Sequence, residues 1–262
     1  MCIRDRIKNW SVSILLAGAM LWGLQCYSAS SLKFAQVSDV HFYTGENNTT
    51  FKMIAESPKL LDDAIDQINS TPNVSFVMFT GDQIDKSFEK ELSAFLPHTT
   101  KLNAPWYFAF GNHDTCIGGY LTPALYMQLV NEYNKNYKFE KSYYSFVPQK
   151  GYKAIVLDTI IRDRLTSNGR LGEQQLAWLD NELSNSKKDT VLIFMHVPVI
   201  EPYNSPNHRL LDADKMEEIL NKYKNPIAVF QGHYHGAKIT QRGNILFVSC
   251  LLYTSPSPRD CS

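Results

Sequence analysis

The chain has 262 residues, 44% of them hydrophobic, with 26 Lys and Arg against 26 Asp and Glu. This length and apolar content predict one large folded domain or two small ones, and exclude a disordered or collagen-like chain. The formal net charge of zero gives no nucleic-acid-binding signature, because such a surface needs an excess of Lys and Arg.

Both ends of the chain resemble adapter sequence rather than protein. One DNA word encodes the opening Met-Cys-Ile-Arg-Asp, and its reverse complement encodes the Cys-Leu-Leu-Tyr-Thr-Ser that begins at Cys250. A genuine Ser/Pro-rich tail is the alternative. We interpret residues 1–6 and 250–262 as adapter-like artefacts, and expect the natural gene to continue past both ends.

Residues 7–30 have the pattern of a secretory signal peptide. Lys8 precedes an apolar run over 12–24, and small residues follow at 28–31. The run is shorter than the roughly 20 residues that span a membrane, so no stable span is expected after cleavage. A buried N-terminal helix is the alternative, and Gln25 disfavours lipoprotein anchoring through Cys26. We expect an exported protein, periplasmic, extracellular or at the cell surface, whose domain comprises residues 31–249.

The body of the chain alternates apolar strand-like runs with helical patterns. Strands are expected at Leu32–Ser38, Val74–Thr80, Pro105–Phe110, Tyr143–Val147, Tyr152–Leu157, Val191–Met195, Ile227–Gln231 and Ile245–Val248, with helices at Ser57–Ser70, Leu171–Leu183 and near Asp212–Tyr223. Runs without strict alternation indicate strands that are covered on both faces. The pattern predicts one α/β domain with layered sheets.

Polar residues that can bind metals follow the predicted strands. The segments are Ser38-Asp39-Val40-His41, Gly81-Asp82-Gln83-Ile84-Asp85, Gly111-Asn112-His113-Asp114, Met195-His196 and Gly232-His233-Tyr234-His235. Taken singly, each fits an ordinary turn or a core histidine. Together they hold five of the seven histidines of the chain. Because the carboxyl ends of strands in α/β sheets converge on one crevice, this distribution predicts a functional site there.

The ordered motifs Asp-x-His, Gly-Asp-x-x-Asp, Gly-Asn-His-Asp, His and Gly-His-x-His, between Phe34 and Gly236, resemble the calcineurin-like metallophosphoesterases. The pattern is similar to the branch containing cyclic-nucleotide phosphodiesterases. The resemblance implies a four-layer αββα sandwich, with two mixed β-sheets flanked by helices. Family members have further strands after Gly-His-x-His, so the adapter-like tail implies truncation at the C-terminal strands.

The resemblance also implies a ligand set for two divalent metal ions, Mn, Fe or Zn. Asp39, His41 and His235 would hold one ion, Asn112, His196 and His233 the other, and Asp82 would bridge both. Carboxylate, amide and imidazole ligands suit these metals. The implied activity is hydrolysis of small-molecule phosphate mono- or diesters by attack of a metal-bridging hydroxide.

Two further residues are expected to act in catalysis. By resemblance, His113 stabilises the developing charge or protonates the leaving oxygen, and a purely structural role is its alternative. Asp114 is expected to orient the His113 imidazole. Ile84 and Asp85 stand where purple acid phosphatases carry a tyrosine ligand, which predicts a colourless enzyme of a non-purple branch. Asp158 either supports the site or holds a turn.

The sequence leaves several alternatives open. The aromatic-rich segment 115–141 is either a lid or a helix that packs its aromatics into the core. The loop 200–209, with His208, is either a pocket wall or a plain surface loop. A non-catalytic phosphate- or protein-binding scaffold of the same fold, or a non-hydrolytic metal-binding protein, is the alternative to an enzyme. The sequence does not distinguish a monoester from a diester substrate, and it does not give the oligomeric state.

Overall fold

The computed structural model describes residues 31–49, 52–116 and 118–250, and the fold is that of the unit that begins at Leu32. The expected signal peptide, residues 7–30, lies outside the described residues. So do the expected adapter-like ends, apart from Cys250. Within the described part of the chain, no helix is long and apolar enough to cross a membrane.

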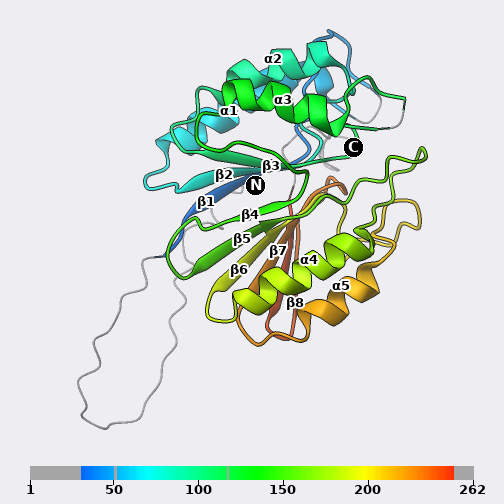
Figure 1. Ribbon diagram of the computed structural model, residues 1–262. Helices are drawn as coiled ribbons and strands as arrows, with labels where there is room; N and C mark the ends of the chain where they lie inside the picture. Colours follow the sequence, from blue (N-terminus) through cyan, green and yellow to red (C-terminus); the bar gives the residue numbers. More distant parts are fainter. Residues whose placement is uncertain (1–30, 50–51, 117, 251–262) are drawn as a thin grey trace, which may run out of the picture. The chain divides into compact units, whose positions relative to one another are not determined.

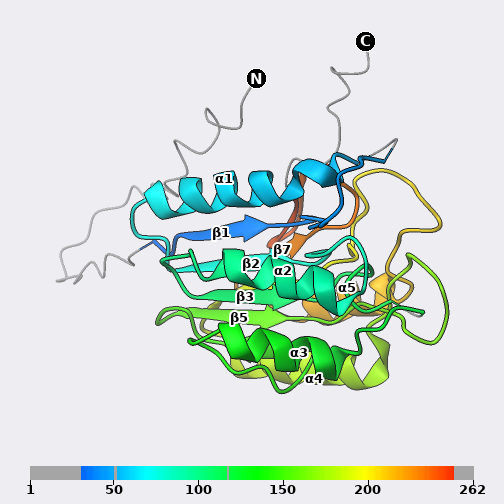
Figure 2. The ribbon, with the colours of Figure 1, turned by 90° about the horizontal axis from the view of Figure 1, so that it is seen from above.

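The smaller sheet contains three parallel strands in the order β1-β2-β3. Their bounds are Phe34–Val37, Phe76–Thr80 and Trp106–Ala109. All five residues of β2 are buried, as expected for a strand covered on both faces. Helices α1 (Ser57–Ser70), α2 (Glu89–Thr99) and α3 (Pro123–Tyr133) lie side by side over its outer face (Figures 1 and 2).

Local sequence explains where these helices begin and which face they bury. Helix α3 starts with Pro123 after Thr122, whose Oγ1 accepts a hydrogen bond of 3.2 Å from the backbone N–H of Leu125. In α1, Leu61 and Ile65 are buried one turn apart, so this stripe packs on the sheet.

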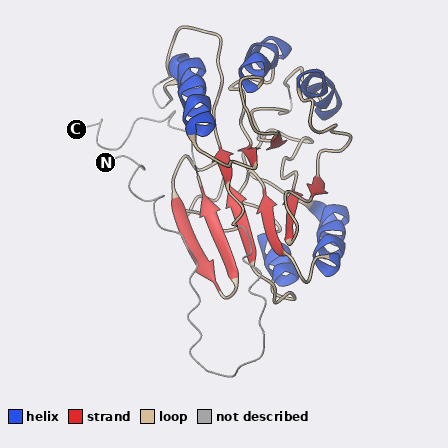
Figure 3. Ribbon diagram, turned by 90° about the vertical axis from the view of Figure 1, so that its left-hand side faces the viewer, coloured by secondary structure: helices blue, strands red, loops and turns tan. Residues whose placement is uncertain are grey.

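The larger sheet has six strands in the order β4-β5-β6-β7-β9-β8. Their bounds in chain order are Tyr144–Phe146, Tyr152–Val156, Thr190–Phe194, Ile227–Gln231, Lys238–Arg242 (β8) and Ile245–Ser249 (β9). The edge strands β4 and β8 are antiparallel to their neighbours, and the four strands between them are parallel. Helices α4 (Gly172–Asn185) and α5 (Ala213–Leu220) cover the outer face (Figures 1 and 3).

Aromatic side chains fill the space between the two sheets. The ring of Phe34 on β1 lies 5.0 Å from Phe76 on β2, and also 5.0 Å from Phe230 on β7 of the larger sheet. At one edge, the Tyr144 hydroxyl on β4 donates to the Phe108 carbonyl at 2.7 Å and accepts from the Phe108 N–H at 3.1 Å. These contacts join the two sheets into one core.

The predicted αββα sandwich is confirmed, with one correction. Among the described strands the smaller sheet is parallel throughout, so only the larger sheet is mixed, whereas we expected both to be mixed. Two strands, β8 and β9, follow the Gly-His-x-His motif. The expected C-terminal truncation concerns the chain beyond Cys250, which lies outside the described residues.

The segment 115–141 contains helix α3, whose aromatic side chains pack inward. Tyr126 is buried, and Tyr133 and Tyr137 pack against the core, while Tyr120 is exposed. The core-packing alternative therefore describes most of this segment. Helix α2 and strand β8 were not predicted.

Candidate metal centre

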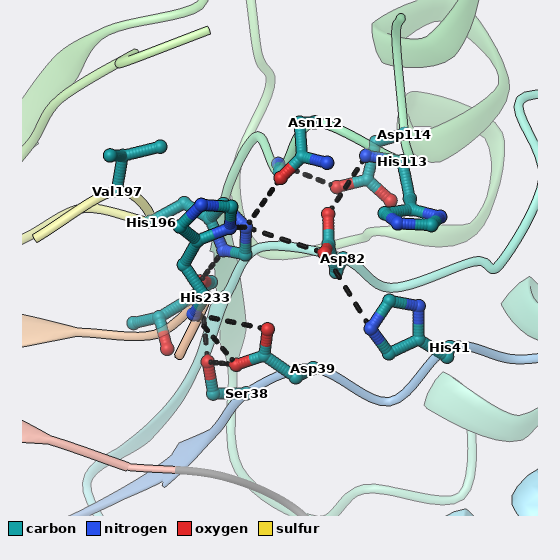
Figure 4. Close-up of polar contacts among 12 residues, drawn as sticks. Ser38, Asp39, His41, Asp82, Asn112, His113, Asp114, His196, Val197 and His233 are labelled. Atoms are coloured by element: carbon teal, nitrogen blue, oxygen red, sulfur yellow. Dashed lines mark hydrogen bonds and ion pairs between the residues drawn. The ribbon is translucent and has the colours of Figure 1, made fainter. Parts of the chain in front are cut away.

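All seven predicted ligands come together where the loops after five strands meet, and Figure 4 labels every one of them except His235. They are Asp39, His41, Asp82, Asn112, His196, His233 and His235. Three groups have ligand atoms that all lie within 4.8 Å of one another: Asp39–His41–His235, His41–Asp82–His113 and Asp82–His196–His233. The prediction that these distant segments share one site agrees with this geometry.

The backbone is strained at most of these ligands. The angle φ is positive at five of them: 57° at Asp39, 46° at His41, 50° at Asp82, 73° at His233 and 48° at His235. Each such conformation costs an L-residue about 1–2 kcal/mol. Among the described non-glycine residues, Asn73 alone shares this feature. Backbone strain of this kind concentrates at functional sites, because the fold must be held against it.

Two glycines of the motifs are required by close approach to ligands. A Cβ at Gly81, where φ is 95°, would lie 2.2 Å from Nδ1 of His196. A Cβ at Gly111 would lie 2.0 Å from the backbone nitrogen of Asp82. Because neither position can hold a side chain, Gly-Asp and Gly-Asn are structural parts of the site.

The first cluster contains Asp39, His41 and His235. Nε2 of His41 lies 3.0 Å from Nε2 of His235, which lies 3.6 Å from Oδ1 of Asp39. Ligand atoms about 2.0–2.1 Å from a shared metal ion are about 2.9–3.4 Å apart, so this spacing suits coordination. Nδ1 of His41 lies 3.2 Å from Oδ1 of Asp85, and donating there leaves the Nε2 lone pair facing the cluster.

The second cluster contains Asn112, His196 and His233. Nε2 of His196 lies 3.1 Å from Oδ1 of Asn112 and 3.2 Å from Nδ1 of His233. Nδ1 of His196 donates to the Thr80 carbonyl at 2.9 Å. Because a carbonyl can only accept, Nδ1 carries an N–H, and in the neutral ring the Nε2 lone pair of His196 points into the cluster.

Asp82 lies between the two clusters. Its Oδ2 is 3.6 Å from Nε2 of His41 and 3.4 Å from Nε2 of His196. Its Oδ1 accepts the backbone N–H of His113 at 2.8 Å, which fixes the carboxylate (Figure 4). One oxygen thus faces both sets of imidazoles, as a bridging ligand requires.

Burial and charge set the protonation of these groups. Burial lowers the pKa of His41 to about 4, that of His233 well below its usual value, and also that of His235. Neutral imidazoles are the form that binds metals. Burial would also lower the pKa of His196, but Asp82 outweighs this and raises it to about 9. The site therefore favours a positive charge beside Asp82, which is the charge that a cation supplies.

The hydrogen bonds of Asp114 differ from the prediction. Its carboxylate accepts backbone N–H groups of Gly111 at 2.7 Å and Ile84 at 3.2 Å, which holds the Gly111 turn. It does not orient His113. Nδ1 of His113 instead donates to the backbone carbonyl of Asp85 at 2.6 Å. The expected pairing was wrong because adjacent residues in a turn point their side chains in different directions.

The structure also shows what Asp85 and Asp158 interact with. Burial opposes ionisation of Asp85, but the hydrogen bond from His41 together with the charges of His41, Lys52 and His113 lowers the Asp85 pKa. Asp158 accepts the N–H of Ile160 at 3.1 Å and pairs with Arg162 at 2.9 Å, so it holds a turn. The supporting role of Asp85 could have been found from its place in Gly-Asp-x-x-Asp.

A cavity of about 270 Å³ opens above the ligands. Its other lining residues include Lys52, Ser167, Tyr203, Ser205, His208 and Tyr234. The loop 200–209 is therefore a pocket wall, which was one of the two alternatives. Lys52 and Ser167 lie in loops without a recognisable pattern, so sequence reasoning missed them.

Comparisons with known proteins identify the family of the chain. A sequence model of the family described as calcineurin-like phosphoesterase matches residues 32–237. A probable glycerophosphodiester phosphodiesterase of Arcobacter nitrofigilis is 26% identical over 229 residues, covering 85% of this chain and 77% of that protein. A probable cyclic nucleotide phosphodiesterase of Colwellia psychrerythraea is 24% identical over 214 residues, covering 78% of this chain and 72% of that protein.

A crystal structure of a dimetal phosphatase from Danio rerio has the same fold. Its TM-score is 0.69 at 19% identity, covering 87% of this chain and 90% of that chain. The chain belongs to the calcineurin-like phosphoesterase family. It is a metal-dependent phosphoric ester hydrolase, and the predicted similarity to the cyclic-nucleotide phosphodiesterase-like branch is confirmed.

Proposed function

We propose that this calcineurin-like phosphoesterase hydrolyses phosphate mono- or diesters at the Asp82 site with two divalent cations, Mn, Fe or Zn. The observation that carries the proposal is Oδ2 of Asp82, which lies 3.6 Å from His41 and 3.4 Å from His196. A carboxylate shared by two ligand clusters suits a pair of ions about 3.5–4 Å apart.

The donor set fits two such ions. Asp39, His41 and His235 would hold one, Asn112, His196 and His233 the other, and Asp82 both. Nε2 of His233 is buried without a hydrogen-bond partner among the described residues. Nδ1 of the same ring lies 3.2 Å from Nε2 of His196 and is the atom that would hold the ion, within a set of imidazole, amide and carboxylate donors that suits Mn, Fe or Zn. When bound, the ions would supply Lewis acidity and lower the pKa of a coordinated water.

Residues of the chain outside the ligand set would orient the ester. Because Nδ1 of His113 donates to the Asp85 carbonyl, Nε2 is the atom free to contact an ester oxygen or to pass a proton to the leaving oxygen. Lys52 lines the same cavity and adds positive charge near the phosphate. Overall, water and one ester are converted to an alcohol and a phosphate with one ester bond fewer.

The test is turnover of p-nitrophenyl phosphate and bis-p-nitrophenyl phosphate with Mn²⁺, in the wild type, Asp82→Asn and the control Asp66→Asn. Asp66 is an exposed carboxylate on α1. Asp82→Asn should lose at least about a hundredfold in turnover and weaken metal binding, whereas Asp66→Asn should do neither. Wild-type protein that is folded and binds Mn²⁺ but turns over neither compound would favour the non-catalytic alternative. Unchanged turnover in Asp82→Asn would contradict the proposed site.

We also propose that the chain is exported and that residues 7–30 direct the export. The support is the basic start, the apolar run and the small residues that follow it. Cell fractionation of the full chain should place it outside the cytoplasm, and deletion of residues 7–30 should retain it inside. Equal distribution of the two forms would contradict this proposal.

A further inference from the structure

We propose that the site selects phosphodiesters with one hydroxylated, polar arm and one apolar, ring-bearing arm. This inference rests on the proposed hydrolytic function and decides between the monoester and the diester. It is carried by a second cavity of about 470 Å³ beside the first. Asn112, His113 and Ser167 line both cavities. The groove therefore continues past the metal ligands instead of ending at them.

The side of the groove formed by the loop 200–209 is polar. Oγ of Ser205 lies 2.7 Å from Nδ1 of His208, whose ring is 5.4 Å from that of His233. The Tyr203 hydroxyl donates to the Tyr234 carbonyl at 3.0 Å, which holds this wall together. Hydroxyl and imidazole groups beside a metal ligand suit an arm that carries hydroxyls.

The side beyond His113 offers apolar side chains, although the charged Asp85 and Lys86 also line it. Phe88 and Leu165 line the second cavity, and the ring of Tyr120 packs 5.4 Å from that of Phe88. Leu165 is 84% exposed and Tyr120 is 77% exposed, the two highest values among the large apolar side chains described. Exposed apolar side chains that gather at the mouth of an active site mark a ligand-binding surface.

This apolar wall is preformed. The N–H of Tyr120 donates to the Ser87 carbonyl at 2.9 Å, and the Ser87 hydroxyl donates to the Asp114 carbonyl at 2.9 Å. Nε of Arg162, three residues before Leu165, donates to Oγ1 of Thr115 at 3.0 Å, and Arg162 also pairs with Asp158. Walls held by such bonds need little ordering when a ligand binds, which favours affinity.

A diester would fill both sides of the groove, whereas a monoester would leave one side empty. In the reaction, water adds to phosphorus and the P–O bond to the arm beside the loop 200–209 breaks, so the apolar side holds the arm that only a diester has. The oxygen of that arm keeps the electron pair and gains a proton. It leaves as an alcohol, and the other arm remains as a phosphomonoester.

The test compares kcat/KM for bis-p-nitrophenyl phosphate and p-nitrophenyl phosphate in Leu165→Ser and in the control Ile239→Ser. Ile239 is also exposed, at 61%, but lies on β8. Leu165→Ser should lower kcat/KM for the diester about tenfold and change it less than about twofold for the monoester. Leu165→Met should restore the diester value, and Ile239→Ser should change neither. An equal loss for both substrates, or no loss for the diester, would overturn the proposal.

A binding measurement separates failure of the subsite from failure of the hydrolytic function. Cys116 lines the apolar cavity and is half-buried. Diphenyl phosphate should slow alkylation of Cys116 by N-ethylmaleimide, read by mass spectrometry of its peptide, and inorganic phosphate should not. Protection without turnover would refute the hydrolytic function but support the subsite. If the enzyme turns over both substrates but shows neither protection of Cys116 nor a preference for the diester, the subsite is refuted and the hydrolytic function is not.

Discussion

Asp85 lies behind His41, with its Oδ1 3.2 Å from Nδ1 of that imidazole. The other ring nitrogen, Nε2, faces Asp82 and His235 on the opposite side. A carboxylate that accepts the distal N–H of a metal-binding histidine fixes its tautomer and increases its basicity. Lys52, at 3.6 Å from the same oxygen, helps to keep Asp85 ionised.

Replacement of Asp85 should therefore weaken metal binding without unfolding the protein. Asp85→Asn keeps the volume but removes the charge, so the affinity for Mn²⁺ should fall by about 10–100-fold. Competition with a fluorescent chelator measures this directly. Asp163→Asn, at an exposed aspartate, is the matched control. An affinity equal to that of the control would show that Asp85 does not act through His41.

The buried histidines predict that the metal-free protein is destabilised by acid. The pKa of His41 is about 4 when folded and 6.5 when unfolded, so the unfolded chain takes up the proton first. The stability that neutral His41 contributes to the folded state is complete above pH 6.5 and is lost as the pH falls toward 4. It amounts to about 3 kcal/mol. Urea unfolding in a chelator between about pH 4 and pH 8 measures it, and His41→Gln should flatten the acid side. An unchanged slope in that variant would contradict the assignment.

His196 predicts the opposite pH dependence and a release of protons on metal binding. Its pKa is raised from 6.5 to about 9, so its stabilisation of the metal-free fold is complete below pH 6.5 and lost as the pH rises toward 9. At about pH 7 it holds a proton that a metal ion must displace. Calorimetry in buffers of different ionisation enthalpy should show about one proton released per chain from His196.

Two variants distinguish this source of protons from the other ligands. His196→Gln should abolish the release. His235→Gln should preserve it, because burial already lowers the pKa of His235. If the wild type and His196→Gln released the same number of protons on metal binding, the proton would come from a group other than His196.

Much of the fold followed from burial patterns that the sequence displays. Helix α1 was predicted at Ser57–Ser70, the bounds that the structure has. Helix α2 was missed because Pro97 lies within it, although Leu92, Phe95 and Leu96 have helical spacing. Pro97 removes one i→i−4 hydrogen bond, and the helix ends two residues later, at Thr99. Strand β8 was missed because its residues Lys238–Arg242 are mainly polar and exposed, and its pairing with β9 alone defines it.

The metal ligands of the site could be predicted because they follow the ends of strands. The hydrogen-bond partners of the side chains around them could not be predicted. The turn at Gly111 directs Asp114 to backbone N–H groups, a geometry that no residue spacing encodes. Lys52 and Ser167 reach the cavity only through tertiary packing of long loops. Sequence pattern therefore identified the residues that could bind metal, but not the groove around them.

The close approach of Gly111 to Asp82 predicts that a single methyl group disables the site. In Gly111→Ala the new Cβ would lie 2.0 Å from the Asp82 nitrogen and 2.2 Å from its Oδ1. The bridging carboxylate must move, so turnover should fall at least about a hundredfold. Gly236→Ala is the control, because its Cβ would meet no atom closer than 3.6 Å. Metal content and turnover measure both variants, and equal activity would refute the steric argument.

Removing the Tyr144 hydroxyl should lower the stability of the fold without changing the rate of the catalysed reaction. Its hydroxyl satisfies both backbone groups of Phe108 on the edge strand β3, and thereby links the two sheets. Tyr144→Phe leaves a buried N–H and a buried carbonyl without this partner, so the free energy of unfolding should fall by about 1–3 kcal/mol. Urea unfolding measures the loss, with Tyr152→Phe as control. Because the hydroxyl bonds to the β3 backbone and not to the ligands, kcat of the folded variant should equal that of the wild type. A lower kcat at full metal occupancy would instead show that the join between the sheets positions the ligands.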